Sequence, residues 1–255
     1  MVKKTVIKNN FSRNAESYDK YSSVQRNSAR KLISILPVGE FKKILDIGCG
    51  TGLYTGFLRE RFRSSNIKAL DISREMIEIA KDKLRESSIE FVVGDAEKAK
   101  FSENYDLITS NASFQWFDDL GKVLRLYKKL LNEKGIMLFS IFGPRTFYEL
   151  NESLRTLFGK DIATSSSGFI EKPEIKNILE RHFANVSVDE EIYEEKHNSV
   201  KELLQKIKYS GIRGYGTGRK GFWTSQIIGK LDCIYKERFP SRTATYQVFF
   251  CRGEK

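Results

Sequence analysis

The sequence has few cysteines, few histidines and no long apolar run. Its 255 residues contain three cysteines, Cys49, Cys233 and Cys251, an odd number at wide spacing. This usage argues against a disulfide framework and against a zinc cluster, so we expect free thiols and no metal. The longest nearly pure apolar run, 136–142, is far shorter than a membrane span, and the N-terminal residues lack the hydrophobic stretch of a secretory signal. We therefore expect a cytoplasmic protein without a membrane partner.

Histidine chemistry is equally sparse. The two histidines, His182 and His197, lie far along the chain, and no Ser/His/Asp or Cys/His arrangement accompanies them. A nucleophilic triad is therefore not expected. The net charge of +11, from 44 basic and 33 acidic residues, fits a nucleic acid, an acidic protein or an anionic substrate as partner, and charge alone does not choose among them.

Short apolar runs alternate with helical patterns along most of the chain. The runs predict strands at 43–47, 67–70, 90–93, 105–110 and 135–142, and helices near 53–62, 73–86, 118–132 and 173–182. Such alternation is typical of a parallel sheet with crossover helices. Before it, residues 11–36 carry apolar side chains at helical spacing up to Pro37, which predicts one or two N-terminal helices.

The C-terminal third has a different pattern. It predicts strands at 185–193 and 243–251 and helices at 200–209 and 222–239, with the last strand antiparallel at the sheet's edge. We expect an α/β, Rossmann-like fold with a mostly parallel seven-stranded sheet. One domain, 1–255, divides into an N-terminal helical cap (1–40), a cofactor-binding core (41–142), an inserted lid (143–172) and a C-terminal sheet edge with substrate-docking helices (173–255).

A glycine-rich loop follows the first strand of the core. It reads Asp46-Ile47-Gly48-Cys49-Gly50-Thr51-Gly52, and its third glycine stands at 52 rather than at 53, where a dinucleotide-binding loop would have it. This spacing resembles that of methyltransferases. S-adenosylmethionine has no pyrophosphate but carries an ammonium and a sulfonium, so an acid such as Asp46 beside the loop is favourable. The loop therefore predicts S-adenosylmethionine as cofactor.

Acidic or amide residues end the next three strands. Asp71 can accept hydrogen bonds from both ribose hydroxyls, and Asp95 can accept one from the adenine amino group. Met76 is spaced to pack on the adenine face, and Asn111 is expected beneath the sulfonium. Each acid alone is more simply a helix cap or a loop acid, but together they occupy the carboxyl edge of the sheet, where open α/β sheets bind ligands.

Further motifs extend a resemblance over nearly the whole chain. They are 11–19 with Gln25, 113–116 (Ser-Phe-Gln-Trp), 142–144 with Thr146 and 149–150, 208–214 (Lys-Tyr-Ser-Gly-Ile-Arg-Gly) and 244–248 (Ala-Thr-Tyr-Gln-Val). The first two also occur in related small-molecule methyltransferases, such as those acting on trans-aconitate. On all of them together the chain resembles the malonyl-acyl-carrier-protein O-methyltransferases of biotin synthesis. Arg145 departs from the pattern, since many relatives have glycine or another small or polar residue there.

The resemblance implies a class I methyltransferase fold and an early step of biotin synthesis. The enzyme would methylate the free carboxylate of a malonyl thioester on acyl carrier protein, so that fatty-acid synthesis accepts a chain whose end is otherwise charged. The expected cofactor-binding residues are Tyr18, Gln25, Asp46, Gly48, Cys49, Gly50, Asp71, Ile72, Met76, Asp95, Ala96 and Asn111.

A carboxylate acceptor sets the expected mechanism. With a reference pKa of about 4 it is ionised at neutral pH and needs no general base. Catalysis then consists of holding its oxygen about 3 Å from the methyl carbon in a water-poor pocket. The candidate catalytic residues are Tyr18, Gln115, Trp116 and Arg145. Arg145, Arg213 and Arg242 are the candidate cations for the substrate carboxylate.

The partner expected from the resemblance is acyl carrier protein carrying malonyl, bound by a monomer. Carrier protein is acidic, so the candidate docking face consists of C-terminal basic residues: Lys206, Lys208, Arg213, Arg219, Lys220, Lys230, Arg238 and Arg242. A methyltransferase for a small carboxylic acid of the trans-aconitate type, an RNA methyltransferase and a non-catalytic cofactor sensor stay open as alternatives. Against RNA, the chain lacks an Asn-Pro-Pro-aromatic motif, a positioned catalytic cysteine and an appended nucleic-acid module, so no nucleic acid is expected.

Overall fold

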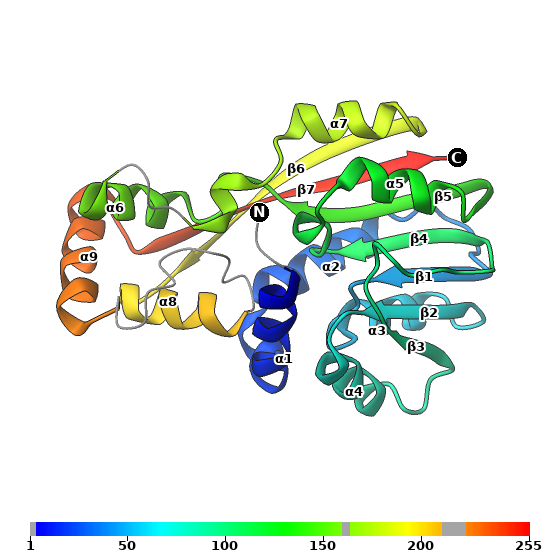
Figure 1. Cartoon of the computed structure of the whole chain (residues 1–255), viewed down its shortest axis with the longest axis horizontal. Coiled ribbons are helices and arrows are strands. Elements are labelled where there is room, and N and C mark those ends of the chain that lie inside the picture. Colours follow the sequence, from blue (N-terminus) through cyan, green and yellow to red (C-terminus); the bar gives the residue numbers. More distant parts are fainter. Residues whose placement is uncertain (1–3, 160–163, 211–222) are drawn as a thin grey trace.

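The strands of the chain form a mixed sheet. The computed structural model describes residues 4–159, 164–210 and 223–255. Within them, seven strands pair in the order β3-β2-β1-β4-β5-β7-β6 (Figure 1). They are β1 (Lys43–Ile47), β2 (Asn66–Asp71), β3 (Ile89–Val93), β4 (Tyr105–Asn111), β5 (Leu131–Phe142), β6 (Ala184–Lys196) and β7 (Thr243–Glu254). The α/β fold class predicted from the alternating pattern is confirmed.

Helices cover both faces of this sheet. They are α1 (Lys4–Tyr21), α2 (Ser23–Ile35), α3 (Leu53–Arg61), α4 (Arg74–Lys83), α5 (Leu120–Lys128), α6 (Tyr148–Phe158), α7 (Lys172–Glu180), α8 (Val200–Tyr209) and α9 (Ser225–Arg238). Ile44 and Leu45 of β1 are both fully buried but belong to different apolar cores, because successive side chains of a strand point to opposite faces. A strand buried on both sides explains the unbroken apolar run that predicts β1.

The antiparallel strand differs from its expected place. β7 pairs antiparallel with both β5 and β6, so it lies one position inside the edge, and β6 is the edge strand. The reason lies in the two sequences. In β7 nearly every side chain is buried, whereas β6 alternates buried or half-buried positions with exposed acids such as Glu190 and Glu194. Water-facing carboxylates suit an edge strand, while an apolar strand is stable only between two neighbours.

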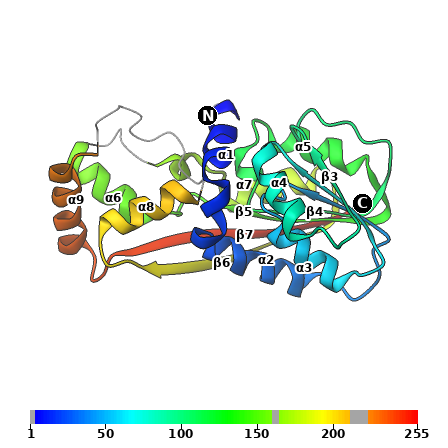
Figure 2. The ribbon, with the colours of Figure 1, turned by 90° about the horizontal axis from the view of Figure 1, so that it is seen from below.

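β6 and β7 continue past the rest of the sheet. β5 ends at Phe142, opposite Val248, but β6 and β7 stay paired as far as Lys196 and Thr243. The resulting two-stranded ribbon carries α6, α8 and α9, and α1 lies between this group and the parallel core (Figures 1 and 2). Tyr21 of α1 stacks on Tyr209 of α8 with ring centroids 5.0 Å apart. The ribbon thus places the C-terminal helices beside the N-terminal one.

The segment predicted to be a lid, 143–172, contains α6 and a short 3-10 helix, η2 (Ser165–Gly168). α6 packs on α9 and β7 at the ribbon. Near the segment's end, Phe169 makes an edge-to-face contact with Trp116 at 5.5 Å between ring centroids. Its role as a lid stays a prediction. In the part of the chain that is described, no helix combines the length and apolar character needed to cross a membrane.

The interior place of β7 predicts a large difference between two truncations. Phe249→Ala, where the side chain is 0% exposed, is expected to lower the free energy of unfolding by about 3–5 kcal/mol, because it leaves a cavity. Ile192→Ala on the edge strand β6, where the side chain is 40% exposed, should cost less than about 1 kcal/mol. Urea denaturation measures both. Similar losses for the two variants would contradict this placement of the strands.

Candidate cofactor and active site

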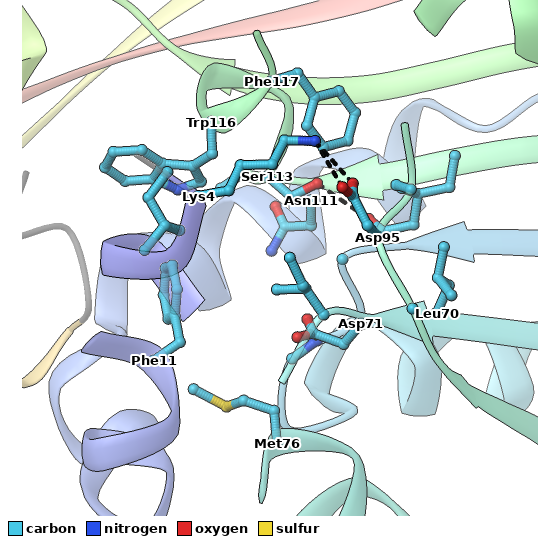
Figure 3. A pocket seen from close by; sticks show the side chains of 18 of the residues that line it. Lys4, Phe11, Leu70, Asp71, Met76, Asp95, Asn111, Ser113, Trp116 and Phe117 are labelled. Carbon is cyan, nitrogen blue, oxygen red and sulfur yellow. Dashed lines mark hydrogen bonds and ion pairs between the residues drawn. The ribbon is translucent and has the colours of Figure 1, made fainter. Parts of the chain in front are cut away.

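A pocket lies at the carboxyl ends of β1 to β4, where open parallel sheets bind ligands. It holds about 740 Å³ of empty space, including the part open to solvent. Lys4 and Phe11 of α1 face the strand ends across it (Figure 3). The predicted residues that line it are Tyr18, Gly48, Gly50, Asp71, Ile72, Met76, Asp95, Ala96, Asn111 and Trp116.

The glycine loop needs glycine at each of its three positions. Gly48, Gly50 and Gly52 have φ angles of 70°, 54° and 80°, in the left-handed region that side chains disfavour. A Cβ on Gly48 would lie 2.4 Å from the Cβ of Ser113, while around Gly50 there is open space. Gly52 is the N-cap of α3, and a Cβ there would lie 3.0 Å from the Cβ of Ala80. The loop therefore presents bare backbone to the pocket.

Asp71 ties this loop to the end of β2. Its Oδ2 accepts a hydrogen bond from the amide of Gly50 at 2.9 Å, and its Oδ1 accepts one from the amide of Ser73 at 2.8 Å. Desolvation raises the pKa of Asp71, and the two amides oppose that shift. The carboxylate lines the pocket with lone pairs to spare, as an acceptor for the two hydroxyls of a ribose requires.

Asp46 lies behind the loop and is fully buried. Its Oδ2 accepts a hydrogen bond from the hydroxyl of Thr55 at 2.6 Å, but its Oδ1 has no hydrogen-bond partner among the described residues. Desolvation, partly offset by Thr55 and reinforced by the charge of Asp71, raises the pKa of Asp46 to about 7. Positive charge in the pocket would stabilise the ionised form of this acid. Asp46 thus lies outside the pocket lining, and its role toward the cofactor stays a prediction.

Asp95 forms an ion pair with Lys4, a residue that the sequence did not point to. Nζ of Lys4 lies 2.8 Å from Oδ1 and 3.0 Å from Oδ2 of Asp95 and also pairs with Glu97 (Figure 3). Although burial alone would raise the pKa of Asp95, the hydrogen bonds and charge of Lys4 lower it. Lys4 shares a helix face with Ile7 and Phe11 at spacings of three and four, so extending the helical pattern before Phe11 would have found it.

Aromatic side chains form the wall opposite the loop. Phe11 makes edge-to-face contacts with Tyr18 at 6.1 Å and with Trp116 at 6.3 Å between ring centroids. Desolvation, with the nearby charges of Asp19 and Asp71, raises the pKa of Tyr18. Its hydroxyl therefore stays protonated at neutral pH and is suited to donate a hydrogen bond rather than to remove a proton.

Two predicted residues support the pocket from behind. The backbone carbonyl of Gln25 accepts a hydrogen bond from Nδ2 of Asn111 at 3.0 Å, and Oδ1 of Asn111 accepts one from the hydroxyl of Ser140 at 2.9 Å. Nε2 of Gln115 donates to the carbonyl of Ala112 at 2.7 Å, and its Oε1 is buried without a hydrogen-bond partner among the described residues. Neither glutamine lines the pocket, so direct contact of either with a ligand stays a prediction.

The structure does not bring three other candidates to the pocket. Arg145 is exposed and does not line the pocket, and its backbone amide donates a hydrogen bond to Oε1 of Gln247 at 3.0 Å in the turn after β5. Arg242 forms a bidentate pair with Asp232, at 2.7 and 2.9 Å. Cys49 is buried but is not in the lining. Arg213 lies outside the described residues.

The residues present fit S-adenosylmethionine. Bare glycine backbone leaves room for its methionine part, and Asp71 offers acceptors for its ribose. The unpartnered oxygen of Asp46 favours a positively charged ligand. Asp95 and Met76 remain the expected contacts of its adenine.

The crowding at Gly48 predicts a selective loss of cofactor binding. Gly48→Ala is expected to weaken binding of S-adenosylhomocysteine at least about 100-fold, because the new methyl group displaces Ser113 and the loop's φ becomes strained. Gly229→Ala on α9, which would meet nothing within 4 Å, should bind as the wild type does. Titration calorimetry gives both constants. Wild-type affinity in Gly48→Ala would contradict the placement of the cofactor.

The raised pKa of Asp46 predicts a component of the protein's pH-dependent stability. Between the ordinary value of 3.8 and about 7, the folded protein holds this proton more tightly than the unfolded chain does. Its contribution to the free energy of unfolding therefore falls as pH rises through that window. Between pH 4.5 and 7.5 this group should lower the free energy of unfolding of the wild type by an amount on the order of 1–3 kcal/mol, and Asp46→Asn should not show this decrease. Urea denaturation of the cofactor-free proteins tests this, and parallel pH profiles for the two would refute it.

Comparison with known proteins identifies the family. A family model described as "Methyltransferase domain" matches residues 45–139. Malonyl-[acyl-carrier protein] O-methyltransferase 1 of Ilyobacter polytropus is 38% identical over 242 residues, covering 94% of this chain and 89% of the relative. The malonyl-[acyl-carrier protein] O-methyltransferase of Bacillus anthracis is 36% identical, covering 98% of this chain and 97% of the relative.

Solved structures agree on the fold. The YcgJ protein of Bacillus subtilis superposes with a TM-score of 0.63 at 18% identity, covering 90% of this chain and 98% of that one. Phosphoethanolamine N-methyltransferase 2 of Haemonchus contortus, solved with S-adenosyl-L-methionine, gives a TM-score of 0.54 at 17% identity, over 91% of this chain and 53% of that one. At such identities the likeness concerns the fold alone. The sequence relatives decide the family: this chain belongs to the malonyl-[acyl-carrier protein] O-methyltransferases, which are S-adenosylmethionine-dependent class I methyltransferases.

Proposed function

We propose that this protein transfers the methyl group of S-adenosylmethionine to the free carboxylate of malonyl-acyl carrier protein. The observation that carries the proposal is that, among the described residues that line the pocket, none is free to act as a general base. The titratable groups that line it are Lys4, Tyr18, Asp71 and Asp95. Lys4 and the two acids are engaged with one another or with the backbone, and Tyr18 stays protonated. Such a site suits an acceptor that is already ionised.

The reaction needs no proton transfer. S-adenosylmethionine, held by the glycine loop and Asp71, would supply an electrophilic methyl group to an oxygen lone pair of the malonyl carboxylate. The electron pair of the carbon–sulfur bond would stay on sulfur, so the exchange balances without a proton acceptor. Tyr18 is placed to donate a hydrogen bond inside the pocket, and Phe11 and Trp116 keep water from that side of it. Exclusion of water strengthens the attraction between carboxylate and sulfonium.

Among the described residues, the predicted docking lysines and arginines differ in whether they are already paired with acids of this chain. Lys206, Arg238 and Arg242 pair with acids of this chain, namely Glu195, Glu152 and Asp232. Arg213, Arg219 and Lys220 lie outside the described residues. Lys208 of α8 and Lys230 of α9 are exposed, and both helices belong to the group that the ribbon carries beside α1. These two lysines are our first candidates for contact with carrier-protein acids.

Charge reversal tests this face. Lys208→Glu with Lys230→Glu is expected to raise KM for malonyl-acyl carrier protein about 10-fold, because complementary rim charges steer association. The Kd for S-adenosylhomocysteine should not change, since neither lysine lines the pocket. Lys100→Glu with Lys122→Glu, both exposed and outside the ribbon helices, makes the same change in net charge and serves as control. Equal effects of the two double variants would exclude a specific face at Lys208 and Lys230.

One assay separates the candidate functions. Methyl-labelled cofactor is incubated with the protein and, in parallel, with malonyl-acyl carrier protein, malonyl-coenzyme A, trans-aconitate and bulk tRNA. The proposal expects label in a base-labile ester on malonyl-acyl carrier protein. Label in RNA, label in trans-aconitate alone, or cofactor binding without turnover on any acid would each overturn it.

A further inference from the structure

The N-terminal helix is fastened over the pocket along its whole length. Near its start, Lys4 pairs with Asp95 and Glu97 beyond β3. In its middle, the Ser12 hydroxyl lies 2.9 Å from that of Ser73 at the N-cap of α4. At its end, Asp19 accepts a hydrogen bond from Thr51 of the glycine loop. The attachment at Lys4 differs from the other two because its partner, Asp95, is expected to bind the cofactor.

Lys4 and adenine require the same carboxylate. Both oxygens of Asp95 lie within 3.0 Å of Nζ of Lys4, and Oδ1 also accepts a hydrogen bond from the amide of Glu97 at 3.0 Å. Lys4 belongs to the pocket lining, so its ammonium reaches Asp95 from the side on which a ligand would sit (Figure 3). An adenine amino group that donates to Asp95 from this side therefore competes with the ammonium for the carboxylate.

Glu97 offers the displaced ammonium a second partner. It pairs with Lys4 already, and the Lys4, Asp95 and Glu97 side chains are 22%, 19% and 11% exposed. Partly buried ion pairs of this kind are screened less by salt than pairs on the surface. Lys4 can thus release Asp95 without becoming an unpaired buried charge, which would be costly.

We propose that Lys4 is a positioning residue of the cofactor site: it holds Asp95 in the empty pocket, yields it to the adenine amino group, and then keeps α1 closed over the filled pocket through Glu97. The proposal rests on the proposed use of S-adenosylmethionine but not on the identity of the methyl acceptor. It makes Lys4 a barrier to cofactor entry and to cofactor exit.

Binding kinetics test it without turnover. S-adenosylhomocysteine is mixed rapidly with the full chain, and the fluorescence of Trp116, which lines the pocket, reports association and dissociation. Lys4→Met keeps the aliphatic stem and is expected to raise both rate constants about 3- to 10-fold with little change in Kd. Glu97→Gln should raise the dissociation rate alone. Lys8→Met, an exposed lysine one turn along the same helix and outside the pocket lining, should leave both rates unchanged.

A second readout concerns the free protein. Hydrogen exchange of the α1 amides should quicken in Lys4→Met but not in Lys8→Met, with Tm unchanged within about 2 °C. Wild-type rate constants in Lys4→Met, or a higher Kd without faster association, would overturn the proposal. Absence of S-adenosylhomocysteine binding in the wild type would instead refute the cofactor assignment itself, so the two failures are distinguishable.

Discussion

The desolvation of three carboxylates at adjacent strand ends is the constraint on which the rest of this structure depends. Asp46 lies near the end of β1, Asp71 is the last residue of β2, and Asp95 comes shortly after β3. Because these strands pair in parallel, the sheet brings the three acids together at one edge. In low dielectric, a nearby like charge raises the pKa of a carboxyl group, as the charge of Asp71 does at Asp46. A ligand with positive charge and several donors relieves this strain.

Each of the three acids has a different kind of hydrogen-bond partner. Asp71 is held by backbone amides, Asp95 by the ammonium of Lys4, and Asp46 by a single hydroxyl that leaves one oxygen without a hydrogen-bond partner in the described part of the chain. The least satisfied acid is therefore Asp46, which directly precedes the glycine loop in the sequence. A buried acid that lacks a hydrogen-bond partner lowers the stability of the cofactor-free protein. A ligand that supplies the missing interaction therefore stabilises the protein when it binds.

Most of the fold and the polar half of the site could be predicted because their signals are local. A buried strand, a turn that demands glycine and an acid at the next strand end follow one another within about 50 residues, from Asp46 to Asp95. Lys4 could not be placed in this way, since its partner Asp95 is 91 positions away and their contact depends on where α1 lies. Motif resemblance pointed to Gln115 and Arg145. The side-chain amide of Gln115 bonds within its own turn and Arg145 is exposed, so their catalytic roles stay predictions. Likewise, predicting β7 as a strand did not reveal that it pairs on both sides.

Proton release on cofactor binding tests the central claim most directly. Titration calorimetry at pH 6.5, in two buffers of different ionisation enthalpy, counts the protons exchanged when S-adenosylmethionine binds. At this pH an α-amino group, with a reference pKa of about 7.7–8.0, is already protonated and contributes little. Because positive charge in the pocket lowers the pKa of Asp46, release on the order of half a proton per cofactor is expected, and Asp46→Asn should abolish it. No release, or net proton uptake, would contradict the account.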